Sequence, residues 1–288
     1  MDKRIIDTQV HIGPGGIEET KKAMDALGIQ KLIIDECWLE NMMEWKPNIV
    51  LDDHTIRHIN PTAQLAAAMY PERFAYVLRV NRRDPEVKAV VRMVKQDPAG
   101  VGIRITPGVD PREWQALGQG EYDDLLSYID ACRLPVFIHM PDHPQLIAQI
   151  AEKFPELTII VDHCGLFNNA MRAMFQGLLP ARSREEQLEL YENVLKLAQY
   201  PNVYIKWAHY SAMFEEKAFP PSKRLSEILR KTIDAFGADR IMWASDFSVN
   251  QSGDTWGELL YSVMGDAHMN AMEKDAILGK NAERILKI

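Results

Sequence analysis

The chain has 288 residues, of which 47% are hydrophobic and 26% are charged, a composition typical of a globular enzyme and not of a disordered protein. Its formal net charge of −8 gives no bulk electrostatic attraction to nucleic acid. No apolar run approaches the roughly 18 residues that a membrane span needs, and no signal-peptide pattern is visible at the N-terminus. The three cysteines are widely separated, which favours reduced thiols over a disulfide scaffold. We therefore expect a cytoplasmic protein that binds neither nucleic acid nor membrane.

Eight short apolar or β-branched runs recur along the chain, and each is typical of a buried strand. They are Arg4–Val10, Lys31–Asp35, Phe74–Val80, Val101–Ile105, Pro135–His139, Thr158–His163, Val203–Trp207 and Arg240–Asp246. Amphipathic stretches typical of helices follow most of these runs. They are Ile17–Leu27, Thr62–Met69, Pro85–Lys95, Tyr122–Cys132, Pro144–Phe154, Glu185–Gln199, Ser222–Phe236, Trp256–Met264 and Met272–Leu286.

Alternation of strand and helix predicts right-handed crossovers and a parallel sheet. Eight such units in one domain over residues 1–288 predict an α/β fold of the (β/α)8 TIM-barrel type. The alternative is a doubly wound open sheet, which would place a Gly-rich phosphate-binding turn after the first strand. The turn Gly13-Pro14-Gly15-Gly16 does not fit that pattern, and its proline lacks one of the amides that the pattern uses. The barrel is therefore favoured.

Three connections are longer than a tight barrel needs, and all of them follow a predicted strand. They are Glu36–Pro61, Cys164–Arg184 and Ala208–Pro221. In a barrel these segments lie at the C-terminal face, where active sites are built. We expect the first of them, which carries Trp38, Trp45, His54 and His58, to form a lid.

Four predicted strands end in a polar side chain: His11, His139, His163 and Asp246. In a parallel barrel the C-terminal ends of all strands face the same mouth, so we expect these side chains to meet. Three imidazoles and a carboxylate suit a divalent metal with an open water position. They also suit acid–base chemistry without a metal.

Several motifs carry a resemblance to the amidohydrolase superfamily. It rests on Ile5-Ile6-Asp7, Gly100-Val101-Gly102-Ile103-Arg104, Asp162-His163-Cys164-Gly165 and Trp243-Ala244-Ser245-Asp246-Phe247. Within that superfamily the chain is similar to the amidohydrolase-related group, which contains lactonases such as 2-pyrone-4,6-dicarboxylate lactonase and L-fuconolactonase, and also metal-dependent decarboxylases. The resemblance spans nearly the whole chain.

The resemblance implies catalytic roles for Asp246 and His163. Asp246 would take a proton from the attacking water and later pass it to the leaving oxygen. His163 would polarise the attacked carbonyl or orient the water. We expect burial in a partly dry mouth to raise the pKa of Asp246 towards the range that this work needs.

The first strand of this family normally ends in His-x-His, whereas here it ends in Gln9-Val10-His11. A Gln carbonyl oxygen is a poorer zinc ligand than imidazole. The resemblance also implies no metal-bridging lysine on the fourth strand, and that strand carries Arg104. A two-metal centre is therefore not expected. Two alternatives stay open: one divalent metal, zinc before others, held by His11, His139 and Asp246, or no metal at all.

Cations near the strand ends predict how a substrate would bind. Arg104, Arg79 and Lys206 would form a fork for a substrate carboxylate if they face the mouth. Tyr204 and Asn168 are further candidates for substrate contacts, although the inward-facing half of the seventh strand cannot be assigned without its register.

We therefore expect a hydrolase that opens a small, carboxylated lactone by attack of water on the ring carbonyl. The alternative within the superfamily is a metal-dependent decarboxylase, which would need a tightly held metal. A third hypothesis is a barrel that only binds a metabolite. The expected partner is a small anionic substrate, and association into a homo-oligomer stays open.

Overall fold

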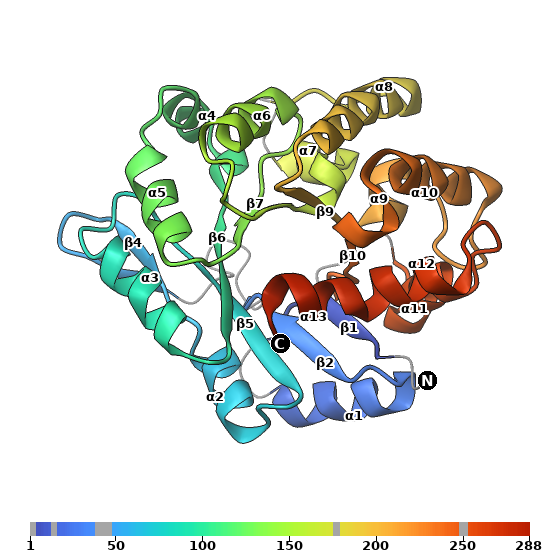
Figure 1. The fold of residues 1–288 in the computed structure, drawn as a ribbon, viewed down its shortest axis with the longest axis horizontal. Helices are drawn as coiled ribbons and strands as arrows, with labels where there is room; N and C mark the ends of the chain where they lie inside the picture. The colour runs from blue at the N-terminus through green and yellow to red at the C-terminus, as the bar shows by residue number, and fades with distance from the viewer. Residues whose placement is uncertain (1–3, 13–15, 38–47, 175–178, 248–252) are drawn as a thin grey trace.

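The structure is a computed structural model that describes residues 4–12, 16–37, 48–174, 179–247 and 253–288. Eight parallel strands form one sheet in the order β1-β2-β5-β6-β7-β8-β9-β10, and helices surround them (Figure 1). The expected TIM barrel is confirmed. The strands are β1 Ile6–Val10, β2 Lys31–Ile34, β5 Phe74–Arg79, β6 Gly100–Ile105, β7 Val136–Ile138, β8 Ile159–Val161, β9 Val203–Trp207 and β10 Ile241–Trp243.

The helices lie outside the strands, and every helix expected from the sequence is present within a few residues of its expected ends. In the described ranges no helix has the length and apolar character needed to cross a membrane. The helices are α1 Ile17–Leu27, α2 Pro61–Met69, α3 Val87–Gln96, α4 Pro111–Gly118, α5 Asp123–Ala131, α6 Pro144–Lys153, α7 Asn169–Met174, α8 Arg184–Leu195, α9 Tyr210–Phe214, α10 Lys223–Phe236, α11 Trp256–Met264, α12 Ala271–Asp275 and α13 Asn281–Leu286, with 3₁₀ turns at Pro107–Val109, His163–Gly165, Lys196–Gln199 and Ala238–Arg240.

The interior of the barrel differs between its two ends. One cluster of buried apolar side chains combines inward-facing residues such as Ile6 and Phe137 with Ile285 and Leu286 of α13. This helix closes the N-terminal end of the barrel (Figure 1). The strand interior at that end is therefore filled and apolar, and polar groups are left to the opposite end.

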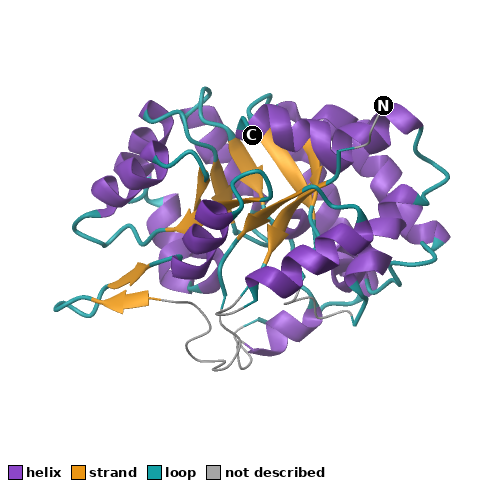
Figure 2. Cartoon of the chain, turned by 90° about the horizontal axis from the view of Figure 1, so that it is seen from below, coloured by secondary structure: helices purple, strands orange, loops and turns teal. Residues whose placement is uncertain are grey.

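Some elements were not expected from the sequence. The connection 36–61 contains a short hairpin of β3 Asn48–Val50 and β4 Ile56–His58, which projects from the body of the molecule (Figure 2). The expected lid residues Trp38 and Trp45 lie outside the described residues. Helix α4 was missed, although Asp110 caps it by accepting from the Arg112 N–H and Pro111 begins it.

The expected single helix over 272–286 is interrupted by a π-helical turn at Ala276–Lys280. Gly279 lies in this turn, and a Cβ built there would meet the carbonyl oxygen of Arg4 at 1.9 Å. The backbone of the C-terminal segment therefore approaches the start of β1 more closely than any other residue would allow.

The barrel closes at the seam between β1 and β10, through individual contacts and not through a long ladder. The N–H of His11 donates to the carbonyl of Phe247 at 2.6 Å, and the N–H of Asp246 donates to that of Gln9 at 3.0 Å. The Thr8 hydroxyl donates to the Trp243 carbonyl at 2.7 Å. These contacts fix the end of β1 beside the segment that follows β10, so His11 and Asp246 become neighbours.

Asp7 reinforces the seam from its outer side. Its carboxylate accepts from the Ser245 N–H at 3.0 Å and from the Trp256 indole at 2.8 Å, and the Trp256 ring stacks on Phe247. Burial, only partly offset by these hydrogen bonds, raises the pKa of Asp7 from its usual value of 3.8 to about 6. Asp7 therefore links β1, the segment after β10 and α11. When it is ionised, the desolvation of its buried carboxylate costs stability.

This predicts a pH-dependent effect of Asp7→Asn. Because the folded protein holds the Asp7 proton more tightly than the unfolded chain, the wild type loses stability as the pH rises from 4 to about 6. The asparagine side chain does not titrate. Relative to the wild type, the free energy of unfolding of the variant should therefore rise by up to about 3 kcal/mol across that interval. Denaturant unfolding of both proteins at several pH values measures it, and a difference that stays flat would contradict this account.

Candidate active site

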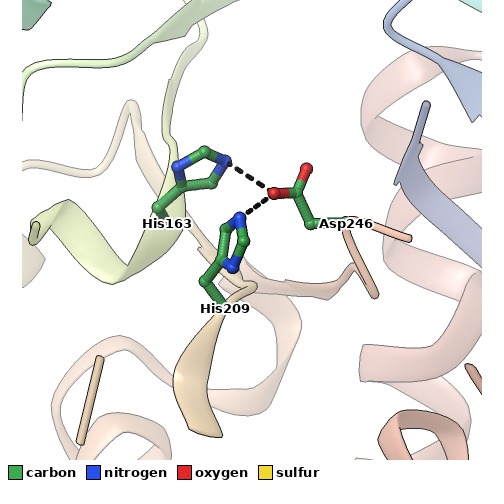
Figure 3. A group of neighbouring side chains, drawn as sticks. All are labelled: His163, His209 and Asp246. Carbon is green, nitrogen blue, oxygen red and sulfur yellow. Dashed lines mark ion pairs between the residues drawn. The ribbon is translucent and has the colours of Figure 1, made fainter. Parts of the chain in front are cut away.

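Three buried side chains from separate strand ends converge at the C-terminal end of the barrel. The Asp246 carboxylate lies against His209 Nε2 and 3.6 Å from His163 Nε2 (Figure 3). Each of the three residues offers one ligand atom, and these atoms lie within 4.8 Å of one another. The structure thus brings Asp246 and His163 together as expected, and adds His209.

His11 and His139 complete the surroundings. His11 Nε2 lies 2.8 Å from the second oxygen of Asp246, so His11 and His209 flank the same carboxylate. The ring of His139 lies 4.9 Å from that of His163 and 5.4 Å from that of Phe167. His139 therefore belongs to the cluster through its contact with His163.

The backbone is strained where the three converging residues leave their strands. His163, His209 and Asp246 have φ values of 51°, 53° and 58°, in the left-handed region that residues with a Cβ rarely adopt. Such conformations cost on the order of 1–3 kcal/mol each and concentrate at functional sites. The strain points the three side chains towards a common centre instead of along the strand direction.

In β1 a bulge turns the functional side chains towards the site. The β1–β2 pairing shifts register between Asp7 and Val10. Ile6 packs inside the barrel, and strict alternation would then turn Gln9 and His11 outward. Because the bulge adds one residue, both side chains face inward instead, where Gln9 reaches His163 and His11 reaches Asp246.

A layer of buried charges lies directly beneath this cluster. Asp162 accepts from Arg104 Nε at 2.7 Å and pairs with Lys206 Nζ at 2.8 Å. Asp35 accepts from Arg79 Nε at 2.7 Å and also pairs with Arg104. Burial opposes the charge of Asp162, but Arg104 and Lys206 outweigh it and hold the pKa of this carboxyl below its usual range. These five residues form a floor in which three cations share two carboxylates, and every charge has an opposite charge beside it.

Gln9 connects the floor to the imidazoles, and Lys206 fixes its orientation. Lys206 can only donate, and its Nζ lies against Gln9 Oε1. The amide nitrogen is thereby turned towards the two histidines, 3.2 Å from His163 Nε2 and 3.4 Å from His11 Nε2. Gln9 therefore presents donors to the centre of the site, and its carbonyl oxygen is engaged elsewhere.

The three cations expected to bind a substrate carboxylate are already paired with carboxylates of the protein. Arg79, Arg104 and Lys206 face the barrel interior, but Asp35 and Asp162 pair with them. Their role in substrate binding stays a prediction that the ion pairs do not favour.

The two other candidates for substrate contacts lie apart from this floor. Tyr204 lies two residues before Lys206 and packs against the apolar cluster at the N-terminal end of the barrel. Asn168 is buried at the C-terminal side, where its Oδ1 accepts from the Met171 N–H at 2.7 Å.

The expectation of a raised pKa for Asp246 is wrong. Burial does raise it, but the imidazoles of His209, His11 and His163 outweigh burial and hold the pKa well below its usual range. For His163 burial dominates the opposing attraction of Asp246, so its pKa lies well below the usual value. The cluster therefore holds an ionised carboxylate next to a neutral His163.

The hydrogen-bond donors around the imidazoles assign their tautomers. The Gln9 amide donates towards His163 Nε2, so this nitrogen carries a lone pair. His11 donates from Nδ1 to the Asp35 carbonyl at 2.6 Å, which leaves His11 Nε2 facing the Asp246 carboxylate. This nitrogen and the Asp246 oxygen 2.8 Å away are two donor atoms that a shared metal cation would bind together.

The donor set fits a single divalent metal. Two imidazoles and a carboxylate with one ligand atom each match the three protein ligands of catalytic zinc sites. His11 Nδ1 donates to a backbone carbonyl, as metal-binding histidines typically do with the ring nitrogen that does not bind the metal. His209, which the sequence prediction missed as a ligand, follows β9 by two residues, just as His163 follows β8. That shared offset is the signal that could have revealed it.

Comparison with known proteins agrees with this architecture. A family model described as amidohydrolase matches residues 47–288. The chain belongs to the amidohydrolase family. The expected resemblance is confirmed, and with it the expectation of an enzyme of the hydrolase class.

One curated relative is L-fucono-1,5-lactonase of Burkholderia ambifaria, which is 28% identical over 118 residues. These residues are 41% of this chain and 36% of that protein, so the match spans about a third of the relative's length.

Three solved structures show the same fold along nearly the whole chain. An amidohydrolase from Burkholderia multivorans with bound zinc is 16% identical, with 99% of each chain covered and a TM-score of 0.72. A probable 2-pyrone-4,6-dicarboxylic acid hydrolase from Acinetobacter baumannii with bound citric acid is 15% identical, with 100% of each chain covered and a TM-score of 0.63. A 2,6-dihydroxybenzoate decarboxylase from Rhizobium is 15% identical, with 99% of each chain covered and a TM-score of 0.63. Hydrolases and a decarboxylase therefore share this barrel.

The buried floor predicts a large stability effect of Asp162→Asn. The substitution leaves Lys206 and Arg104 buried without their shared carboxylate, which should cost about 3–5 kcal/mol in free energy of unfolding. The matched control is Asp124→Asn, because the Asp124 side chain is 83% exposed in its pair with Lys88 and should contribute less than about 1 kcal/mol. Urea unfolding measures both, and equal effects would contradict a structural role for the floor.

Proposed function

We propose that this protein hydrolyses a small lactone, with Asp246 moving the proton of the attacking water. The observation that carries the proposal is the buried Asp246 carboxylate surrounded by the imidazoles of His11, His163 and His209. The lactonase among the relatives of the chain supports this reaction class.

The reaction requires a water beside Asp246 and a lactone carbonyl beside that water. As the water oxygen bonds to the carbonyl carbon, one of its protons passes to Asp246. When the ring C–O bond breaks, Asp246 returns this proton to the leaving alkoxide, so the product is a hydroxy acid and the enzyme is unchanged. The neutral His163 and the donors of Gln9 and Arg104 around it would orient the water and favour the developing negative charge.

A carboxylate with a depressed pKa is a weak base, so a metal that acidifies the attacking water would make the proton transfer to Asp246 easier. A divalent cation, zinc before others, held by His163, His209 and Asp246 would lower the pKa of a bound water and polarise the carbonyl. The zinc in the Burkholderia multivorans structure supports this choice. His139 and His11 are the further ligands that the sequence predicts.

Decarboxylation is the second candidate, because the Rhizobium decarboxylase shares the fold. It would use the same cluster to stabilise the electron pair that stays on the substrate carbon when the C–C bond breaks and CO2 leaves, and a proton would then take the place of CO2 on that carbon. Release of CO2 from an aromatic acid, with no opening of any lactone, would favour it over hydrolysis.

The proposal predicts that Asp246→Asn abolishes turnover. Asn cannot accept the proton of the water, so kcat should fall by at least about a thousandfold, as expected for loss of a general base that also orients the nucleophile. A pH-stat assay with a panel of lactones measures the acid released. Circular dichroism and thermal melting establish that the fold persists, and Asp124→Asn is the control. Undiminished hydrolysis by a folded Asp246→Asn protein would refute the role of this residue.

The ligand set predicts how substitutions alter metal content. His209→Ala and His163→Ala should each weaken zinc binding by at least about tenfold, because each removes one of three ligands. His139→Ala should retain zinc, because His139 is not part of the group of ligand atoms that lie within 4.8 Å of one another. Elemental analysis and competition with a chromophoric chelator measure this without reference to activity. Loss of zinc from His139→Ala alone would instead favour the ligand set expected from the sequence.

A further inference from the structure

The hairpin of β3 and β4 and the helices beside it expose an unusual share of apolar side chains. The hairpin projects from the body of the molecule (Figure 2), and β4 lies beside α3 (Figure 1). Among the described residues, six of the nine large apolar side chains that are exposed lie between Ile49 and Met93, in the hairpin, α2 and α3. Apolar exposure concentrated in one part of a surface typically marks an interaction site.

The hairpin has an apolar face that no other described part of the chain covers. Val50 and Ile56 lie opposite each other in the β3–β4 register, so their side chains are neighbours on one face. Val50 is 61% exposed and Ile56 is 38% exposed. Within the described ranges β3 and β4 pair only with each other. A two-stranded hairpin alone is at best marginally stable in water, so a partner on this face would stabilise it.

The base of the hairpin is fixed to the barrel by Arg57. Its Nε and Nη2 donate to the two carboxylate oxygens of Asp84, both at 2.6 Å, and Nη2 also lies 2.8 Å from Glu86. Two such hydrogen bonds between a guanidinium and a carboxylate fix direction as well as distance. The hairpin is therefore held as a projecting arm, and less conformational entropy is lost when a partner binds it.

A groove between α2 and α3 lies at the base of this arm. Its volume is about 290 Å³, and the apolar side chains that line it include Ile59, Leu78, Val90 and Met93. Met93 is 44% exposed. The groove therefore offers an apolar surface on which the exposed pair of a hairpin can pack.

The charges of the arm and of α3 are complementary. The turn of the hairpin carries Asp52 and Asp53, and α3 carries Arg92 and Lys95, and all four side chains are exposed. None of them forms an ion pair with another described residue. Arg92 and Lys95 are three residues apart, so they lie on the same side of α3. An arm that crosses the groove can therefore bring its acidic turn to these two cations.

We propose that the arm docks in the groove of a second copy of this chain, which docks its own arm in return. Arm and groove lie next to each other in each copy, so one twofold axis satisfies both contacts and closes the assembly at two copies. Val50 and Ile56 of one copy pack on Met93 of the other, and Asp52 lies near Lys95 of the other. This dimer does not depend on the proposed reaction.

Sedimentation velocity of the full-length protein over a series of concentrations tests the apolar contact. The wild type should dimerise, and Val50→Lys should raise the dissociation constant of the dimer by at least about tenfold, because it places a charge at the centre of the interface. The matched control is Met272→Lys. Met272 is 77% exposed on α12, on the other side of the molecule (Figure 1), so the control should dimerise like the wild type. Circular dichroism establishes that both variants are folded.

Charge reversal tests the pairing of the arm with α3. Asp52→Lys and Lys95→Glu should each weaken the dimer at least about threefold, and the protein with both substitutions should recover it, because both reciprocal contacts are then restored with exchanged signs. Added salt should weaken the wild-type dimer. A wild type that stays monomeric at every concentration would overturn the inference. Equal dissociation constants for Val50→Lys and Met272→Lys, or no recovery in the double variant, would overturn it as well.

Discussion

The site depends on one buried anion, the carboxylate of Asp246, and on the cationic or polarisable groups that make its burial tolerable. An isolated carboxylate in a protein interior would take up a proton, because desolvation disfavours its charge. Here His209 and His11 are the imidazoles that contribute most to keeping it ionised. The imidazoles can do this only because the β1–β10 seam, the bulge in β1 and three left-handed residues place them within contact distance.

In the layer beneath Asp246 the cost of burying charges is likewise offset by neighbouring opposite charges. Three cations and two carboxylates alternate in the floor, so each buried charge has an opposite neighbour. Gln9 occupies the join between floor and site. A histidine at this position would bring a further metal ligand, whereas Gln9 uses its oxygen for Lys206 and its nitrogen for the imidazoles. Gln9 therefore links the floor to the imidazoles and does not serve as a metal ligand. This arrangement fits one metal better than two.

The sequence predicted the barrel because local hydrophobic patterns specify its strands and helices, and because parallel topology then brings strand ends together. His11, His163 and Asp246 could be placed near one another for that reason. Their contacts could not be predicted, because a one-residue bulge in β1 reverses which side chains face inward. The pairing of Arg79 and Arg104 with Asp35, and the reversed pKa of Asp246, depend on distances between segments remote in sequence. His209 was missed since it lies beyond the apolar run of β9.

We expect water guided by Asp246 to attack the carbonyl carbon of a lactone. Hydrolysis in water enriched in oxygen-18, followed by mass spectrometry of fragments of the hydroxy-acid product, tests it most directly. Attack at the carbonyl carbon places one oxygen-18 atom in the new carboxylate and none in the new hydroxyl group. Label in the hydroxyl group, or CO2 as the product in place of a hydroxy acid, would contradict it.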